Sequence, residues 1–258
     1  MIGVDAILTL RNKGGYYARN RIFSRCYLFF LLSDANRMRK VMDKYQNLDI
    51  QHRSFALGWE VEHFEQMFGS HEAVKPEVLN HWDAANQNDD EHRFNIEGMR
   101  QTDFNFPHSQ PGLIAAKAAG LIGGDSMYWE VFDKLQEGLF VRNLNIADQN
   151  VIDDLVKETS IDFDSWKKQA TNDETKQAVL NDLALVNAYG IQGAPALVID
   201  KKYLISGAQP QELIEQALEQ AAQEANINIT KPTTPQFQVL GDNTGASCRV
   251  ENGTWICD

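Results

Sequence analysis

The stretch from Ala188 to Pro210, AYGIQGAPALVIDKKYLISGAQP, decides the fold of this chain. It predicts, in order, the end of a helix, a tight loop, a strand, a turn, a second strand and the start of another helix. The run Ala196–Ile199 is apolar throughout, which is typical of a strand covered by helices on both faces. Pro195 stands just before it, where proline is tolerated at a strand's start. A cis Ala194–Pro195 bond is compatible with this place, since the cis form of an X-Pro bond costs only about 0.5 to 1 kcal/mol.

Length and charge limit the class of protein. With 258 residues and 43% apolar content, the chain can bury a full core in one large domain or two smaller ones. Its net charge is −12, and no basic cluster is longer than Arg37 to Lys40. This balance argues against nucleic acid or an anionic membrane as the partner.

The N-terminal region offers no targeting signal. Asp5 and Arg11 interrupt the apolar core that a signal peptide needs, and the longest apolar run, Tyr27 to Leu32, is too short to span a bilayer. We therefore expect a cytoplasmic protein without a membrane partner. Three cysteines are too few for a disulfide framework in a chain this long, so they are buried thiols or redox groups.

The pattern along the chain predicts an α/β fold interrupted by helices. The first twenty residues show no clean period, and we expect them to be poorly ordered or a partial strand. Leu48 to Arg53 begins with a strand-like alternation, and the chain from about Trp59 to Thr171 is helical in pattern, with no convincing strand. The predicted order of elements is strand, helix, strand, helical block, helix, strand pair and helix.

This order and the residues GIQGAPALVID and YLISGAQP closely resemble the DsbA-type thioredoxin fold, in particular its FrnE-like branch. RSFAL, FPHSQPGLIAAKAA and EGLFVRNLNIADQNVI match the same branch, and the resemblance covers roughly residues 26 to 225. It implies a thioredoxin-like α/β fold with a large all-helical insertion. Residues 1–65 and 173–230 would form the thioredoxin-like domain, 66–172 the insertion, and 231–258 a C-terminal tail.

The resemblance also implies a function. Proteins of this kind are dithiol–disulfide oxidoreductases or isomerases that act on protein or peptide thiols and disulfides, without a metal or a bound cofactor; glutathione is a candidate redox partner. The loop Gly193, Ala194 and Pro195 would hold the extended peptide beside the redox cysteine. His108 would lie near the active cleft, because the segment that starts at Phe106 lines the cleft in the family. The histidines show no metal-ligand spacing.

The predicted catalytic cysteine is Cys26. The family signature is C-x-x-C at the start of the first helix, where the helix dipole and free N–H groups lower the thiol pKa. Here either Phe29 replaces the second cysteine or Phe23 replaces the first. A second interpretation makes Tyr27 to Leu32 the first strand, because six apolar residues in a row suit a central strand. The helix would then begin at Ser33 or Asp34, no thiol would occupy the catalytic position, and Cys26 would be an inert buried thiol.

Cys248 and Cys257 flank a predicted hairpin. Asn252-Gly253 favours a two-residue turn, and pairing outward from it sets the two cysteines opposite each other in a non-hydrogen-bonded pair. Such a pair has Cα atoms about 4.5 Å apart, within the range of a disulfide. The pair would resolve the mixed disulfide or serve as a second redox couple; a surface clip or two free thiols are the alternatives.

Three functions follow from these patterns. The first is disulfide exchange through Cys26. The second is a peptide-binding or adaptor protein on the same fold without redox chemistry, which Phe29 and the apolar run favour. The third is a glutathione-linked isomerase, since the chain also resembles the 2-hydroxychromene-2-carboxylate group, in which serine often stands at the catalytic position; Ser24 or Ser33 would take that part. Substrate and oligomeric state do not follow from the sequence.

Overall fold

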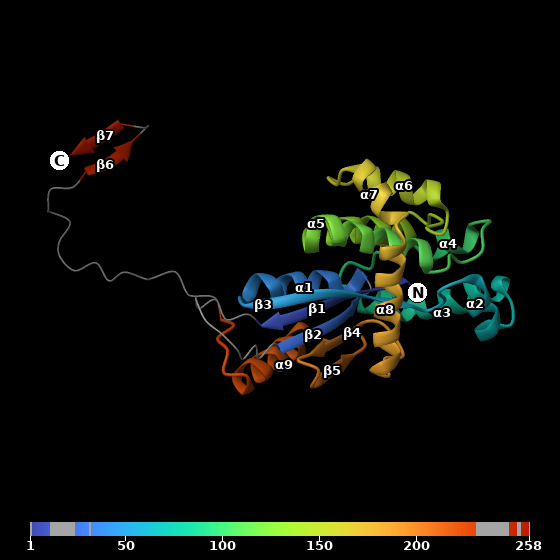
Figure 1. Ribbon diagram of the computed structural model, residues 1–258, viewed down its shortest axis with the longest axis horizontal. Coiled ribbons are helices and arrows are strands. Elements are labelled where there is room, and N and C mark those ends of the chain that lie inside the picture. The colour runs from blue at the N-terminus through green and yellow to red at the C-terminus, as the bar shows by residue number, and fades with distance from the viewer. Residues whose placement is uncertain (1, 11–23, 31, 231–247, 252–253, 258) are drawn as a thin grey trace.

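The computed structural model describes residues 2–10, 24–30, 32–230, 248–251 and 254–257, and the side chains of residues 36–230 (Figure 1). Its strands are β1 (Ile2–Leu10), β2 (Ser24–Phe30), β3 (Leu48–Ala56), β4 (Ala196–Ile199), β5 (Tyr203–Ser206), β6 (Cys248–Glu251) and β7 (Thr254–Cys257). Its helices are α1 (Leu32–Lys44), α2 (Val61–Phe68), α3 (His71–Asn88), α4 (Ile96–Gln101), α5 (Gln110–Gln136), α6 (Gln149–Lys157), α7 (Phe163–Ala170), α8 (Asp173–Ala188) and α9 (Gln211–Glu224), with a π-helical turn at Glu137–Val141.

Five strands form the main sheet. β1 pairs antiparallel with both β2 and β3, while β2 and β3 run parallel and meet at a bridge between Cys26 and Ile50. β4 pairs antiparallel with β2 on one side and with β5 on the other. The predicted strand pair in the opening stretch is confirmed. Of the two alternatives for the first twenty residues, the partial strand is confirmed, because β1 spans nine of them and owes its extended form to its two neighbours.

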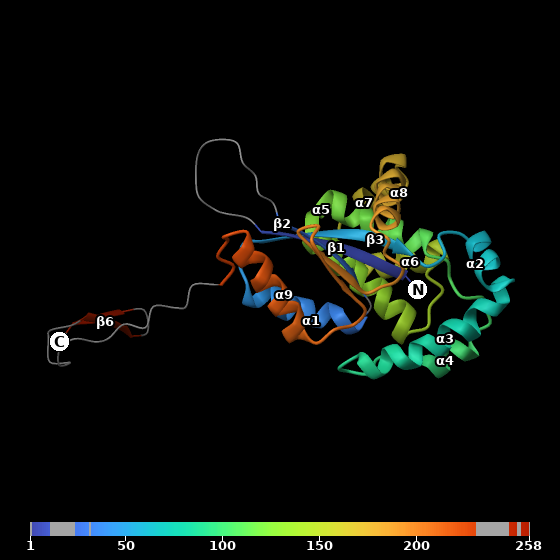
Figure 2. The ribbon, with the colours of Figure 1, turned by 90° about the horizontal axis from the view of Figure 1, so that it is seen from below.

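Helices cover both faces of this sheet. Figure 2 shows α1 and α9 along one face and α5 and α8 on the opposite face. The buried positions of α9 are Ile214, Leu218, Ala221 and Ala222, a spacing that gives the helix one apolar stripe. β4 is buried at all four positions, as a strand between two helical layers must be.

The segment between β3 and α8 is helical, as its pattern predicts. Side-chain oxygens cap four of its helices and α8 by accepting hydrogen bonds from backbone N–H groups, a contact that satisfies donors left free at a helix start. The capping residues are Ser70, Asn95, Asp148, Asp162 and Asn172. None of the described helices is long and apolar enough to cross a membrane.

A buried ionic cluster fastens the helical layer to the sheet. Asp182 on α8 is 1% exposed, and its carboxylate accepts hydrogen bonds from Arg53 Nη1 at 2.7 Å and from the backbone N–H of Ser54 at 3.0 Å. Lys117 on α5 also contacts Asp182 and donates to the carbonyl of His52 at 3.1 Å. One carboxylate therefore joins α5, α8 and β3.

Candidate functional site

A cavity of about 230 Å³ lies between the sheet and α3. The sheet side is formed by the two loops that flank the β4–β5 pair, and these supply Ala194, Pro195, Gly207 and Ala208. The helical side is formed by α3 and the segment after it, which supply His81, Trp82, Ala84, Ala85, Asn88 and Phe94. The lining is thus mostly small or aromatic and carries no lysine, arginine or carboxylate among these described residues.

The loop before β4 is held by the loop after β5. The Ala194–Pro195 peptide bond is cis, and the carbonyl of Pro195 accepts a hydrogen bond of 2.8 Å from the backbone N–H of Gly207. Gly207 has φ of +76°, a conformation that favours glycine. Ala194 also lines the cavity, and none of the backbone hydrogen bonds between described residues involves it.

Strand register brings the start of α1 to this loop. Phe29 of β2 pairs with Ala196 of β4, so Pro195 is level with Phe30. α1 begins two residues later, at Leu32. The first turn of α1, with Ser33 and Asp34, therefore lies at the same end of the sheet as the cavity. This matches the second interpretation of the sequence, in which a strand comes first and the helix starts near Ser33.

Arg37 connects the two walls of the cavity. Its Nη2 donates to the carbonyl of Asn88 at 2.9 Å and to Asp90 Oδ1 at 2.6 Å, at the end of α3. Its Nη1 lies 3.4 Å from the carbonyl of Gln209, in the loop after β5. Because Asn88 lines one wall and Gln209 directly follows the other, this guanidinium sets the width between them.

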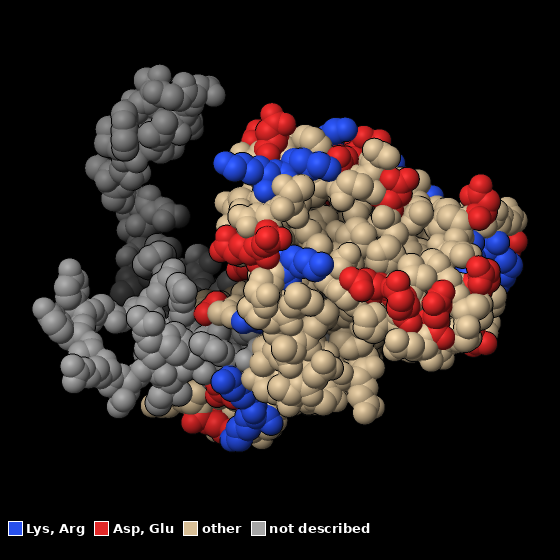
Figure 3. Space-filling view, turned by 45° about the vertical axis from the view of Figure 1, so that its right-hand side comes forward, with Lys and Arg blue, Asp and Glu red and all other residues tan. Residues whose placement is uncertain are grey.

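The acidic groups beside the cavity are held ionised. The hydrogen bond from Arg37 keeps the pKa of Asp90 below its ordinary value. Burial raises the pKa of Asp89, but hydrogen bonds from the side chain and backbone of Arg93 outweigh it and leave that pKa lowered. On the face in Figure 3, acidic and basic side chains are interspersed around a broad uncharged area. Asp90 and Asp89 are each paired with an arginine, Arg37 and Arg93 respectively.

Cys26 lies away from this cavity. It is the third residue of β2, it pairs with Leu8 and Ile50, and it is four residues from Phe30. At about 3.3 Å per residue, that puts it about 13 Å along the sheet from the level of Pro195. Its predicted place at the start of the first helix is wrong, because the apolar run that follows it is a central strand. Phe29 lies in the same strand, and Phe23 falls outside the described residues.

The hairpin register agrees with the one predicted from the sequence. Cys248 pairs with Cys257, and Glu251 with Thr254, around a turn at 252–253 that lies outside the described residues, as does the segment 231–247 of the tail. β6 and β7 form a sheet of their own. The bonding state of the two cysteines stays a prediction.

His108 is not part of the cavity lining that the structure describes. It is half-buried, and burial together with the charge of His71 lowers its pKa, although Glu60 and Glu62 oppose this. The described residues contain no group of three or more His, Cys, Asp or Glu that could hold a metal ion.

Sequence reasoning missed the helical wall of the cavity. Nothing in the pattern of α3 marks Trp82, Ala84 or Asn88 as more than helix positions. Gly207 and Ala208 belong to the stretch from Ala188 to Pro210. The small residues Ser206-Gly207-Ala208 were the one local signal that the loop after β5 lies close to the loop before β4.

Several known proteins are similar to this chain. The family model of the DSBA-like thioredoxin domain matches residues 26–219. A "putative protein disulfide isomerase" from Nitrosomonas europaea has a similar structure, with 24% identity, a TM-score of 0.52, and coverage of 58% of this chain and 74% of that one. A probable DsbA oxidoreductase from Streptomyces coelicolor is also similar, with 19% identity, a TM-score of 0.50, and coverage of 76% and 80%. No curated protein matches the chain.

These structures share the fold, and the family match spans most of the chain. The predicted thioredoxin-like α/β fold with a helical insertion is therefore confirmed. With its strand pair, proline loop and helical insertion in the family's arrangement, the chain belongs to the DSBA-like thioredoxin domain family, whose oxidoreductases act on the thiols and disulfides of their substrates.

Proposed function

We propose that this chain binds an extended, cysteine-containing peptide segment at the cavity beside Pro195. The observation that carries the proposal is the cavity itself, in which the Pro195 loop faces a wall from the helical insertion whose described residues include no lysine, arginine or carboxylate. Extended peptides recognise such a place by pairing their main chain with exposed backbone groups and by inserting one side chain into a pocket.

The size of the cavity supports a single side chain as its occupant. Its volume of about 230 Å³ is below the range of roughly 300 to 1,000 Å³ typical of sites for whole small molecules. Alanine, proline and glycine line most of it, so a small uncharged side chain is the best fit. The backbone N–H and C=O of Ala194, which lines the cavity, would bind the main chain beside it.

The site could bind the peptide alone or also exchange its thiols and disulfides. The first turn of α1, residues 32–36, holds no cysteine, so binding without turnover is the function that the site supports best. Thiol–disulfide exchange on protein substrates, as an oxidoreductase or isomerase of the FrnE-like branch, is the second candidate. What supports it is the family match, whose range includes Cys26. Cys248 or Cys257 would then resolve the mixed disulfide.

A serine in the first turn of α1 also favours glutathione as a ligand. Ser33 is the second residue of this helix, where free backbone N–H groups stabilise a thiolate. Glutathione is itself a short peptide that contains a cysteine. It would therefore bind in the same cavity as the longer peptides proposed above.

The test is binding of a labelled pentapeptide with a central cysteine between alanine and glycine, followed by fluorescence anisotropy. Ala84→Trp fills the cavity from an exposed position on α3, and we expect it to abolish binding. Ala184→Trp, at an exposed position of α8 away from the cavity, is the matched control and retains binding. Equal affinity of both variants, or no binding by the wild type, would overturn the proposal.

Turnover is measured separately. Reduction of a disulfide-linked fluorescent substrate, with reduced glutathione as the electron donor, distinguishes the candidates, and Cys26→Ser tests the cysteine. If Cys26→Ser reduces or isomerises disulfides as fast as the wild type, Cys26 has no catalytic role. Glutathione that displaces the pentapeptide would support the tripeptide as ligand.

A further inference from the structure

Two polar side chains stand at the ends of the helical wall of the cavity beside Pro195. α3 contributes His81, Ala84, Ala85 and Asn88 to this wall. Residues three, four and seven positions apart lie on one face of a helix, so these four form a single stripe along α3. His81, Ala84 and Asn88 are exposed and Ala85 is half-buried, so a ligand in the cavity can reach the stripe.

The stripe matches the length of three residues of extended peptide. At 1.5 Å of rise per residue, His81 and Asn88 are about 10 Å apart along the axis of α3. Three residues of an extended chain span about the same distance, at about 3.3 Å each. The two alanines between the polar ends present only methyl groups, so the main chain of a peptide can approach the helix closely.

Both ends of the stripe have hydrogen-bonding atoms that the described chain does not use. The ring of His81 makes no hydrogen bond or ion pair with a described residue. The amide of Asn88 donates from Nδ2 to the carbonyl of Ala84 at 3.0 Å, and its Oδ1 accepts no hydrogen bond within the described chain. Arg37 fixes this end of the helix, because it donates to the backbone carbonyl of Asn88 at 2.9 Å. The unused atom at the Asn88 end is therefore an acceptor in a fixed place.

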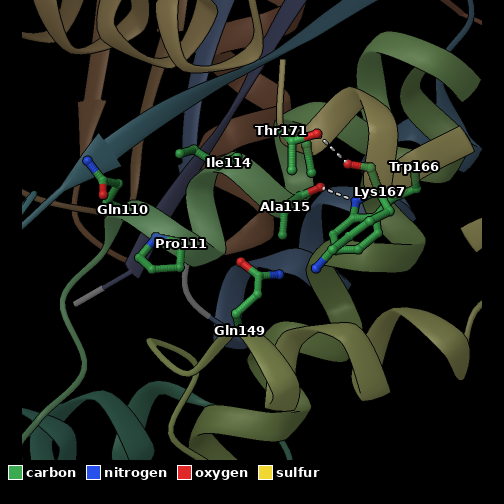
Figure 4. A pocket seen from close by; sticks show the side chains of 9 residues that line it. Gln110, Pro111, Ile114, Ala115, Gln149, Trp166, Lys167 and Thr171 are labelled. Carbon is green, nitrogen blue, oxygen red and sulfur yellow. Dashed lines mark hydrogen bonds between the residues drawn. The ribbon is translucent and has the colours of Figure 1, made fainter. Parts of the chain in front are cut away.

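A second cavity, of about 150 Å³ between α5, α6 and α7, shows a different arrangement (Figure 4). Trp166 donates to the carbonyl of Ala115 and Thr171 to that of Lys167, which are the dashed contacts in the figure. The other polar side chains of its lining also donate to described residues, and these are Gln110, Gln149 and Lys167. The polar groups there are thus used within the protein, whereas the ring of His81 is left for a ligand.

We propose that His81 and Asn88 hold the main chain of the bound peptide across three residues, one at each end of the stripe. Oδ1 of Asn88 accepts a hydrogen bond from a main-chain N–H of the peptide, and the ring of His81 binds its main chain at the other end. This inference rests on the proposed function, because it assigns contacts to the same ligand. The site then recognises three residues of backbone and one small side chain between the polar ends.

The test uses the pentapeptide assay with one variant at each end of the stripe. His81→Leu and Asn88→Leu remove the hydrogen-bonding atoms, and we expect each to weaken binding by roughly two- to tenfold, the range for one neutral hydrogen bond. His81→Gln restores a polar group and recovers most of the loss. His63→Leu on α2 and Asn80→Leu on α3 change exposed positions outside the lining, so they are matched controls and bind like the wild type.

N-methylated peptides identify the contact of Asn88. Pentapeptides in which one amide N–H at a time is replaced by N-methyl are compared on the wild type and on Asn88→Leu. We expect one of them to lose affinity on the wild type and to lose no more on the variant, because its N–H and Oδ1 form one pair. If Asn88 only packs against the ligand, the two losses multiply for every peptide.

The outcomes separate this assignment from the proposed function. If His81→Leu and Asn88→Leu bind like the wild type while Ala84→Trp does not bind, the assignment is overturned and the proposed site stands. If only one of the two leucine variants loses affinity, the three-residue span is overturned. If the losses multiply for every N-methylated peptide, the contact of Asn88 is overturned. If the wild type does not bind the peptide, the proposed function fails and this inference fails with it.

Discussion

The buried carboxylate of Asp182 gives a sharp test of how the helical layer is fastened to the sheet. Asp182→Asn keeps the shape of the side chain and removes its charge. Lys117 and Arg53 then lose their shared counter-ion. Their side chains are only 10% and 30% exposed, so water compensates little for the lost charge. Asparagine also offers one acceptor oxygen in place of two, so the N–H of Ser54 and the two cations compete for it.

The expected loss follows from this burial. Breaking a buried ion pair by removing one partner costs about 3 to 5 kcal/mol, because a buried charge is left without compensation. Arg53 reaches solvent and can turn outward, so only Lys117 is left as a buried charge without a counter-ion. We therefore expect a loss of unfolding free energy at the lower end of this range, about 3 kcal/mol. At roughly 2 to 4 °C per kcal/mol for a chain of this size, Tm falls by about 6 to 12 °C.

Urea denaturation followed by far-ultraviolet circular dichroism measures this loss. Asp154→Asn is the matched control, because its side chain is 76% exposed and pairs with Lys157 at the surface of α6. A surface pair of that kind changes stability by less than about 0.5 kcal/mol. An Asp182→Asn variant as stable as the control would refute the reasoning. The double variant Asp182→Leu with Lys117→Met recovers part of the loss if the uncompensated charge is its cause.

Three further predictions concern other parts of the chain. Arg37→Ala releases the two walls of the cavity, so we expect weaker pentapeptide binding and a loss of about 1.5 to 3 kcal/mol from charge-assisted hydrogen bonds, measured by anisotropy and urea denaturation. Burial lowers the pKa of His52, with Lys117 acting in the same direction and Asp125 against it. The unfolded chain then binds the proton more readily than the folded chain. Stability is therefore lost as pH falls from the unfolded pKa of about 6.5 toward the lower folded value. Urea denaturation at about pH 7.5 and about pH 5.5 will show a smaller loss of stability between the two pH values for His52→Phe than for the wild type. Cys248 and Cys257 form a disulfide under air oxidation, which intact-mass spectrometry detects as the loss of two hydrogens; Cys257→Ser abolishes it, and two unmodified thiols in the oxidised protein would contradict the pairing.

Local chemistry determined much of the fold. An apolar run with a proline before it and a turn after it specifies β4 and β5 from their own residues, since strand and turn preferences act over a few positions. The helical character from α2 to α7 likewise follows from 3.6-residue spacing and from caps such as Asp148. The hairpin register at Cys248 follows from the turn alone.

The tertiary structure alone decided the rest, because the deciding contacts join residues far apart in the chain. Tyr27 to Leu32 reads locally as a strand or as part of a helix, and pairing with β1 and β4 resolves most of it as β2, which moved Cys26 away from the helix start. β1 lacks a clean period and is a strand because two neighbours pair with it. Trp82 reads as one more apolar position of α3, and only the packing of α3 against the loop at Pro195 turns it into the wall of a cavity.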